Sequence, residues 1–209
     1  MTGAEMPTIL AFDTSGKHCA AALLVRDRLV ADRFEPMERG QAERLFPLLD
    51  ELLANAGTTW ADLDAIAVGV GPGNFTGIRI SVAAARGLAL SLGVPAIGIT
   101  TFEIAVAAAD PEGSKRLTGT VRLPGPRETF YAQEFDAGRP AGPASVSTDR
   151  DATGLAEGFD WSRDHGHHWL ARIAAGKLRS DSGHPRPSPL YIRPADAAPA
   201  KDSGPVILP

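Results

Sequence analysis

The most constraining feature of this 209-residue sequence is a long apolar segment flanked by two shorter apolar runs. Ala65 to Val70 and Val94 to Ile99 are continuous apolar runs, as expected for strands buried on both faces. The segment between them, Thr76 to Leu92, has helical spacing and ends at Gly93. Two consecutive buried strands joined through a helix are expected to pair in parallel, with a right-handed connection. The sequence therefore predicts an α/β fold.

Further strands and helices are predicted on both sides of this unit. Three short aliphatic runs separated by polar turns indicate an antiparallel meander: Ile9–Asp13, His18–Val25 and Leu29–Phe34. Leucines at spacings of three and four then indicate a helix that begins near Glu43 or kinks at Pro47, and another helix is predicted over Phe102–Ala109. The order β-β-β-α-β-α-β-α is that of a ribonuclease-H-like or actin-like half-domain, which we assign to residues 1–110.

The second half of the chain differs in composition, because eleven of the seventeen prolines lie after residue 120. A hairpin is predicted from Thr118–Leu123 and Glu128–Phe135, and a short helix over Trp169–Leu178. His184–Pro209 is a proline-rich extended tail. We therefore expect residues 111–209 to form a shortened second lobe.

Composition and charge exclude several classes of protein. Hydrophobic residues make up 44% of the chain, so it is not disordered throughout, and a net charge of −4 argues against a domain that binds nucleic acid alone. A single cysteine, Cys19, excludes an internal disulfide framework and is expected to be a buried thiol.

The longest apolar stretch, Ile78–Phe102, contains Arg79, Arg86 and Pro95, so no membrane span is expected. With no secretory signal at the start either, a cytoplasmic location is expected.

The segment Thr76–Leu92 is apolar almost all round, with only Arg79 and Arg86 charged. A helix of this kind must be buried almost all round, yet a sheet can cover only one of its faces. Small residues at a spacing of four flatten the other face and allow a second helix to approach closely: Ala83, Gly87 and Ser91. The cover is either the chain's own second half or a partner protein. We favour a partner, because the second half is short and rich in proline.

Two polar segments are candidates for binding an anion. Gly71–Gly77 is a glycine-rich loop that opens a helix, where free N–H groups bind anions, although its spacing matches neither GxGxxG nor a Walker loop. The first strand ends in Asp13, but no second carboxylate follows in the hairpin region, and simple turns are the favoured explanation of both segments. The candidate anion or nucleotide contacts are Asp13, Thr14, Ser15, Gly73, Asn74 and Thr76.

The segment Asp164–His168 contains three histidines. It has no HExxH motif, no helical i, i+4 pair of histidines and no nearby cysteine, so a solvated loop broken by Gly166 is expected rather than a metal site. No G-x-S-x-G motif is present. We predict no catalytic residue, metal or cofactor.

Four segments together resemble the TsaB (YeaZ) family, whose members take part in the bacterial synthesis of threonylcarbamoyladenosine in tRNA. They are Ile9–Ser15, the sequence GVGPGNFTGIRISVAAARGLAL over Gly69–Leu90, Gly98–Phe102, and Pro189–Arg193, which resembles a P-x-Y-[LI]-R signature. The resemblance is specific over residues 8–110 and loose over 111–188.

This resemblance implies a two-lobed ASKHA fold, like that of the catalytic subunit TsaD but without its HxxxH iron site. TsaB-like proteins are understood to be non-catalytic and to form homodimers in isolation. They dock on TsaD through two helices of the N-terminal lobe, assemble with the ATPase TsaE, and meet tRNA only through the complex. Carried onto this sequence, the docking surface comprises Leu45, Leu48, Leu49, Leu52, Arg79, Ile80, Ala83, Ala84, Gly87, Leu90 and Ser91.

Two alternatives from other classes remain open. An ATP-using phosphotransferase or ATPase of the same fold needs carboxylates from both lobes around magnesium, and only Asp13 is a credible candidate. A metallopeptidase-like protein needs metal ligands that the sequence does not group together.

Overall fold

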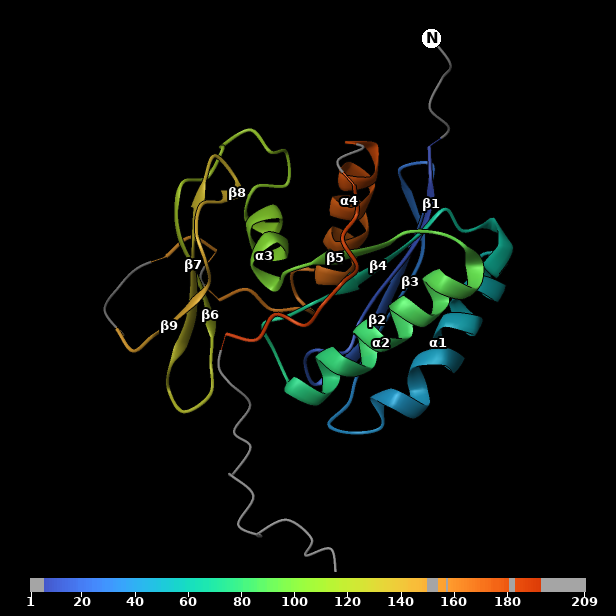
Figure 1. Ribbon diagram of the computed structural model, residues 1–209, viewed down its shortest axis with the longest axis horizontal. Helices are drawn as coiled ribbons and strands as arrows, with labels where there is room; N and C mark the ends of the chain where they lie inside the picture. Colours follow the sequence, from blue (N-terminus) through green and yellow to red (C-terminus); the bar gives the residue numbers. More distant parts are fainter. Residues whose placement is uncertain (1–5, 150–153, 157, 181–182, 193–209) are drawn as a thin grey trace, which may run out of the picture.

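The computed structural model describes residues 6–149, 154–156, 158–180 and 183–192 (Figure 1). The first eight strands and helices follow the predicted order: β1 (Thr8–Asp13), β2 (His18–Val25), β3 (Arg28–Pro36), α1 (Gln41–Asn55), β4 (Ala65–Gly69), α2 (Phe75–Leu92), β5 (Ala96–Ile99) and α3 (Thr101–Ala109), with a 3-10 turn, η1 (Trp60–Asp62), between α1 and β4. The later elements are β6 (Gly119–Pro124), β7 (Phe130–Asp136), β8 (Arg139–Pro140), β9 (Ser145–Ser147) and α4 (Gly166–Arg179).

The first sheet has the strand order β3-β2-β1-β4-β5. Its first three strands form the predicted antiparallel meander, and β1 pairs in parallel with β4, which pairs in parallel with β5. The parallel pairing of β4 and β5 follows from their connection through α2, because a crossover helix brings the chain back to the same end of the sheet. The structure thus confirms the α/β, two-lobed ASKHA-type fold.

Helices cover both faces of the first sheet. Along β1, Leu10 and Phe12 pack with α1 and α2, whereas Ile9 and Ala11 pack with α4. This alternation is the period-2 pattern of a strand whose two faces are both buried. Figure 1 shows α1 and α2 side by side on one side of the sheet.

A second, smaller sheet is formed by β6, β7, β8 and β9, and α3 packs against it through Phe102 and Val106. The predicted hairpin is present as β6 and β7. The helix α4 does not join this sheet: Leu170, Ala171 and Ala174 are buried against the first sheet. The hydrophobic core of the first sheet therefore extends across the predicted boundary at residue 110, because α4, from the second half of the chain, is part of that core.

Cys19 lies buried in the core between the first sheet and α1, as predicted. Burial raises the pKa of its thiol to about 12, so the group is a neutral thiol at neutral pH. Cys19 therefore packs in the core in the same way as a small apolar side chain.

Only part of the predicted proline-rich tail falls within the described residues. Residues 183–192 form no helix or strand, and the backbone N–H of Leu190 donates to the carbonyl oxygen of Val70 at 2.8 Å. Residues 193–209 lie outside the described part of the chain.

Among the described residues, α2 is the one helix that is long and apolar enough to cross a membrane, judged by length and composition alone. A helix that packs on the sheet of a water-soluble protein meets the same criteria, and 33% of this helix is buried inside the structure. The length and composition of α2 are therefore only weak evidence for a membrane span.

Candidate functional site

The outward side of α2 is not covered by the described part of the chain. Leu90 is 83% exposed, and four further residues on the same side are also exposed. We call this set the α2 outer face: Arg79, Ala83, Gly87, Leu90 and Ser91. A Cβ atom built on Gly87 would have no neighbour within 4 Å. The opposite side of the helix is anchored to the sheet by Ile78, Val82 and Ala85. Ile80 and Ala84 lie half-buried between the two sides.

The prediction that the α1 leucines form part of a docking surface is wrong. Leu45, Leu48, Leu49 and Leu52 are each at most 1% exposed and belong to the core between α1, α2 and the first sheet. The apolar stripe was identified correctly, but it is the face by which α1 packs on its own molecule. The exposed large apolar residue of α1 is Phe46, at 45%.

The signature near the C-terminus packs against the start of α2. The Tyr191 ring lies 4.7 Å from the Phe75 ring, centroid to centroid. Arg79 donates through Nε to the Tyr191 hydroxyl at 2.8 Å, and its guanidinium lies 3.7 Å above the Phe75 ring. Arg79 is therefore at the surface, as predicted, and is oriented by its own chain. Sequence analysis missed this contact, although both segments were noted.

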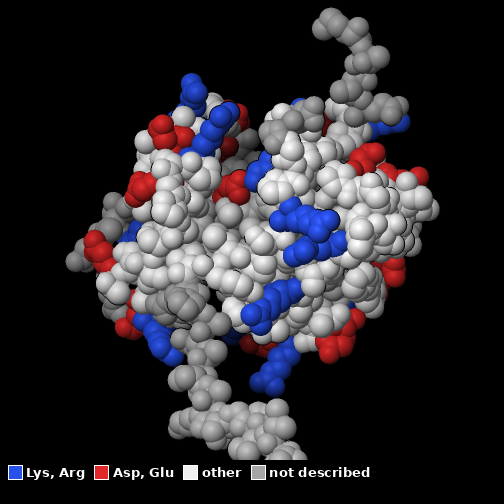
Figure 2. Space-filling view, viewed as in Figure 1, with Lys and Arg blue, Asp and Glu red and all other residues white. Residues whose placement is uncertain are grey.

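Basic side chains gather over the face of the molecule that carries α2. Figure 2 shows Lys and Arg side chains near the middle of this face, with Asp and Glu mainly toward its margins. Both charged residues of α2, Arg79 and Arg86, are exposed. The α2 outer face is thus a small-residue and apolar ridge beside positive charge, despite the net negative charge of the whole chain.

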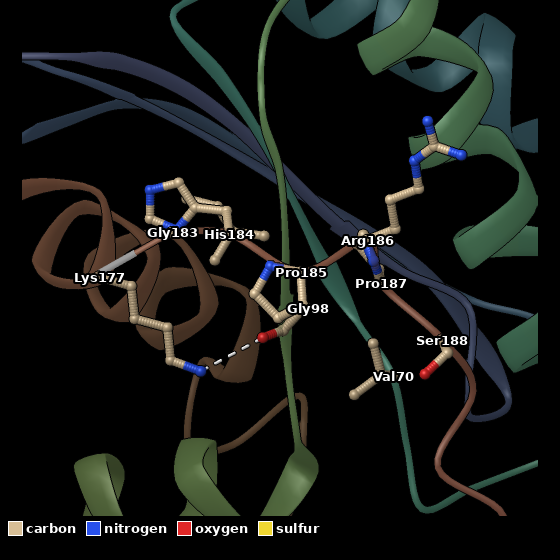
Figure 3. Close-up of a pocket in the computed structure, with 10 residues that line it drawn as sticks. Val70, Gly98, Lys177, Gly183, His184, Pro185, Arg186, Pro187 and Ser188 are labelled. Atoms are coloured by element: carbon tan, nitrogen blue, oxygen red, sulfur yellow. Dashed lines mark hydrogen bonds between the residues drawn. The ribbon is translucent and has the colours of Figure 1, made fainter. Parts of the chain in front are cut away.

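Two grooves lie along residues 183–188 of the tail. One, of about 480 Å³, lies between this segment and the C-terminal half of α2, where Gly87 and Leu90 line it. The other, of about 440 Å³, lies between the segment, β5 and α4. In Figure 3, Lys177 of α4 reaches across this second groove to the carbonyl oxygen of Gly98, at 3.3 Å. The tail therefore runs beside the α2 outer face and leaves it open.

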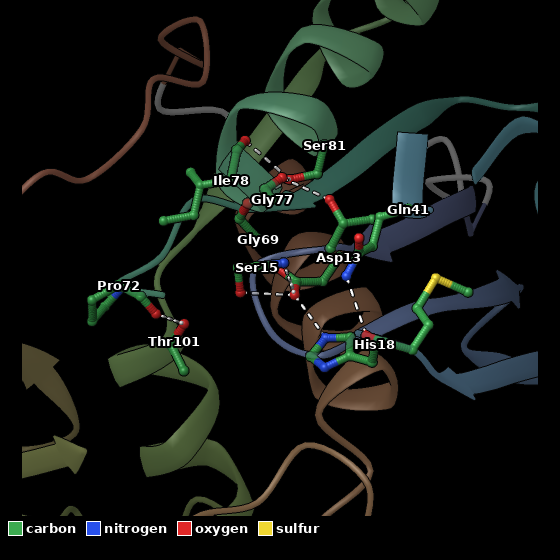
Figure 4. Close-up of polar contacts among 12 residues, drawn as sticks. Asp13, Ser15, His18, Gln41, Gly69, Pro72, Gly77, Ile78, Ser81 and Thr101 are labelled. Carbon is green, nitrogen blue, oxygen red and sulfur yellow. Dashed lines mark hydrogen bonds and ion pairs between the residues drawn. The ribbon is translucent and has the colours of Figure 1, made fainter. Parts of the chain in front are cut away.

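Two of the candidate anion contacts, Asp13 and Ser15, lie at the turn between β1 and β2 (Figure 4), and the backbone N–H of Asn74 donates to the Ser15 carbonyl oxygen at 2.6 Å. Asp13 is buried, and its Oδ1 accepts hydrogen bonds from Ser15 N and Ser15 Oγ, both at 2.8 Å. The Nε2 atom of His18 lies 2.9 Å from the same oxygen. Asp13 Oδ2 has no hydrogen-bond partner and would lie 1.9 Å from a Cβ on Gly69. The Oδ1 atom of Asp13 thus has its hydrogen-bond partners within the turn between β1 and β2, whereas Oδ2 faces the backbone of β4.

The glycine-rich loop packs directly against the turn between β1 and β2. A Cβ on Gly77 would lie 1.9 Å from the Thr14 carbonyl oxygen, and one on Gly73 would lie 2.5 Å from that of Ser15. The side chain of Asn74 caps α2 by accepting from the N–H groups of Thr76 and Gly77. Two of the N–H groups at the start of α2 are therefore satisfied within the chain. The packing supports the turn interpretation of this segment over the nucleotide-binding one.

The prediction of a solvated loop over Asp164–His168 is wrong. The helix α4 begins at Gly166, where a Cβ would lie 2.4 Å from the Trp161 ring, so glycine allows a close contact here rather than breaking the chain. His167 is 1% exposed and His168 is half-buried. The helical pattern from Trp169 onward did not reveal that the helix starts earlier.

Comparisons with known proteins agree with this geometry. The family model described as TsaD, tRNA N6-adenosine threonylcarbamoyltransferase, matches residues 35–133. The chain is 38% identical to the tRNA threonylcarbamoyladenosine biosynthesis protein TsaB of Escherichia coli over 115 residues, which is 55% of this chain and 47% of that protein. The chain thus spans about half the length of this relative. It is 32% identical over 214 residues to an uncharacterized protein of Mycobacterium bovis, covering 95% of this chain and 98% of that one.

Solved structures extend the likeness beyond the N-terminal half. YeaZ from Pseudomonas aeruginosa superposes with a TM-score of 0.68 at 26% identity, covering 89% of this chain and all of that one. A second structure, of a protein described as similar to peptidase YeaZ from Pseudomonas aeruginosa, has a TM-score of 0.70 at 27% identity and covers 90% of this chain. With the matching fold, these relatives show that the chain belongs to the TsaB/YeaZ family.

Proposed function

We propose that this protein is a cytoplasmic accessory subunit in the synthesis of threonylcarbamoyladenosine in tRNA. In this proposal it docks on a TsaD-type catalytic subunit through the α2 outer face and carries out no bond chemistry itself. Without that partner, the same face pairs with a second copy of the chain. A TsaE-type ATPase joins the assembly, and tRNA is met only through the complex. The family membership and the names of the relatives support the pathway.

The uncovered α2 outer face is the observation that carries the docking step. Ala83 and Gly87 lie one helical turn apart, and their small size allows another helix to approach closely. Leu90, at 83% exposed, is a large apolar side chain in water that an interface would bury. A stable pairing of this kind is expected to bury about 1,200–2,000 Å² in total.

Docking would act on the partner's conformation rather than on the chemical step. A subunit that binds one conformation of its partner more tightly shifts the population toward that conformation. The buried, internally bonded Asp13 supports this division of labour, because its Oδ1 already accepts three contacts from its own chain. We therefore expect activity to depend on the presence of the chain in the assembly, and not on a side chain of its own that touches the substrate.

The test compares Gly87→Arg with Gly176→Arg. Both glycines are exposed in helix interiors, and a Cβ added to either would meet no atom within 4 Å, so both variants are expected to fold. Gly176 lies on α4, which packs on the opposite face of the sheet. Co-purification with the TsaD of the same organism, and light scattering of the chain alone, measure the two pairings.

We expect Gly87→Arg to weaken binding of TsaD at least about 100-fold, about 2.7 kcal/mol, and to yield a monomer in isolation, with Gly176→Arg unchanged. Circular dichroism confirms that both variants are folded. Undiminished capture of TsaD by folded Gly87→Arg would refute the proposed surface. Failure of the unmodified chain to bind TsaD at all would refute the proposed function.

A further inference from the structure

Three histidines and an aspartate from distant parts of the chain meet at the start of α4. His165 precedes the helix, His167 and His168 lie in its first turn, and Asp32 comes from β3. One ring nitrogen from each histidine lies within 4.8 Å of the corresponding nitrogens of the other two. The carboxylate of Asp32 faces two of these rings. The sequence spacing of the histidines did not indicate this cluster, because Asp32 lies more than a hundred residues away.

The distances in the cluster suit metal ligands better than hydrogen bonds. Asp32 Oδ2 lies 3.3 Å from His167 Nε2 and 3.4 Å from His168 Nε2. A good N–H···O hydrogen bond is about 2.9–3.0 Å long. Ligands about 2.0–2.1 Å from a tetrahedral zinc ion are about 3.3–3.4 Å apart, which is the separation seen here. The Asp32 carboxylate oxygen thus lies at the separation of two zinc ligands from one nitrogen of each of two histidine rings.

Burial leaves polar atoms of the cluster without partners. His168 Nε2 and His167 Nδ1 are both buried and make no hydrogen bond. An unsatisfied buried polar atom destabilises the folded state by about 1–3 kcal/mol, so such atoms call for an explanation. For His168 the unsatisfied atom is the one that faces Asp32. A bound ion would satisfy it.

An aromatic ring borders the cluster on one side. On the apolar side, the His167 ring lies 5.9 Å from the Phe34 ring, centroid to centroid. This wall limits the access of water to one side of the cluster.

We propose that Asp32, His165, His167 and His168 bind a divalent ion of the zinc class. Imidazole nitrogens with one carboxylate oxygen are a ligand set that zinc accepts in tetrahedral geometry. The positive end of the α4 dipole opposes a cation here, so the charge of Asp32 is needed to offset it. An ion held by Asp32 and His167 would join β3 to the start of α4, so its role is structural. The site lies across the sheet from α2, so ion binding and docking are separable.

The test is titration of the full chain, freed of any affinity tag and of bound metal, with Zn²⁺ in a calorimeter and with Co²⁺ in a spectrophotometer. The variants are Asp32→Asn and His168→Gln, chosen because both side chains are partly exposed and tolerate substitution better than the buried His167. The matched control is His184→Gln, a half-buried histidine of the tail outside the cluster. Thermal unfolding with and without Zn²⁺ reports stabilisation by binding.

We expect one Zn²⁺ per chain with a Kd of about 10 μM or tighter, an intense Co²⁺ absorption typical of four-coordinate geometry, and a rise in Tm on adding Zn²⁺. Each cluster variant should weaken binding at least about tenfold and lose the Tm rise, with His184→Gln unchanged. No binding at about 100 μM Zn²⁺, or equal binding by Asp32→Asn, would overturn the proposal. So would a weak, six-coordinate Co²⁺ spectrum.

Discussion

Gly69, Gly73 and Gly77 determine how closely the loop before α2 approaches the turn between β1 and β2. At each of them a Cβ would lie 2.5 Å or less from an atom of Asp13, Ser15 or Thr14. A hydrogen bond accompanies the close backbone contact at Gly77: Thr14 Oγ1 donates to the Gly77 carbonyl oxygen at 2.7 Å. Glycine is required here for close approach of two backbone segments.

This contact predicts opposite effects for two glycine-to-alanine changes in the same helix. Gly77→Ala should lower the free energy of unfolding by about 1–3 kcal/mol, because the turn between β1 and β2 must move to admit the methyl group. Gly87→Ala should raise it by up to about 1 kcal/mol, because alanine favours the helix and the added methyl meets no atom. Urea unfolding followed by circular dichroism measures both. A Gly77→Ala protein as stable as the parent would contradict this packing.

At the scale of elements, α1 shows what a hydrophobic stripe reveals and what it does not. The spacing of the leucines correctly predicted a helix and its apolar side. It could not distinguish packing on the chain's own sheet from packing on a partner, because the two surfaces need the same residues. Only the sheet itself, with Leu10, Phe12 and Leu23 facing α1 and α2, decides between them.

The corrected role of α1 gives a second prediction. Leu49→Ala should lower the free energy of unfolding by about 2–5 kcal/mol, because it leaves a cavity in the core. Phe46→Ala, one turn away and 45% exposed, should change it by less than about 1 kcal/mol. The midpoint of urea unfolding distinguishes the two. If the two variants were equally stable, Leu49 would not be a core residue.

The prediction of elements from the sequence was most accurate where the pattern was local. The strands of the meander and the end of α2 at Gly93 follow from neighbouring residues. The candidate sites were less predictable, because their partners are distant in sequence. Tyr191 meets Arg79, and Asp32 meets His167, only when the chain has folded.

At the scale of the whole molecule, α4 closes a core that begins at the other end of the chain. Ala171, Ala174 and Ala175 are buried against the face of the first sheet opposite α1 and α2. Alanines at this spacing let the helix approach the sheet closely. In the sequence they form a short helical segment in a proline-rich half, and nothing local indicates which sheet they cover.

This closure predicts that residues 1–110 do not fold as an independent domain. Without α4, apolar side chains of β1, β2, β4 and β5 would be exposed to water: Ile9, Ala11, Leu24, Ala67 and Ile97. Their burial contributes about 25 cal/mol per Å² of apolar surface, which a domain of marginal stability cannot lose. We expect residues 1–110 alone to bind an apolar dye strongly and to unfold in urea without a cooperative transition, whereas the full chain shows a sharp one. The alternative outcome is a cooperative urea unfolding of residues 1–110, with a denaturant dependence (m-value) in proportion to the length of that fragment. It would show that the first lobe is stable without α4.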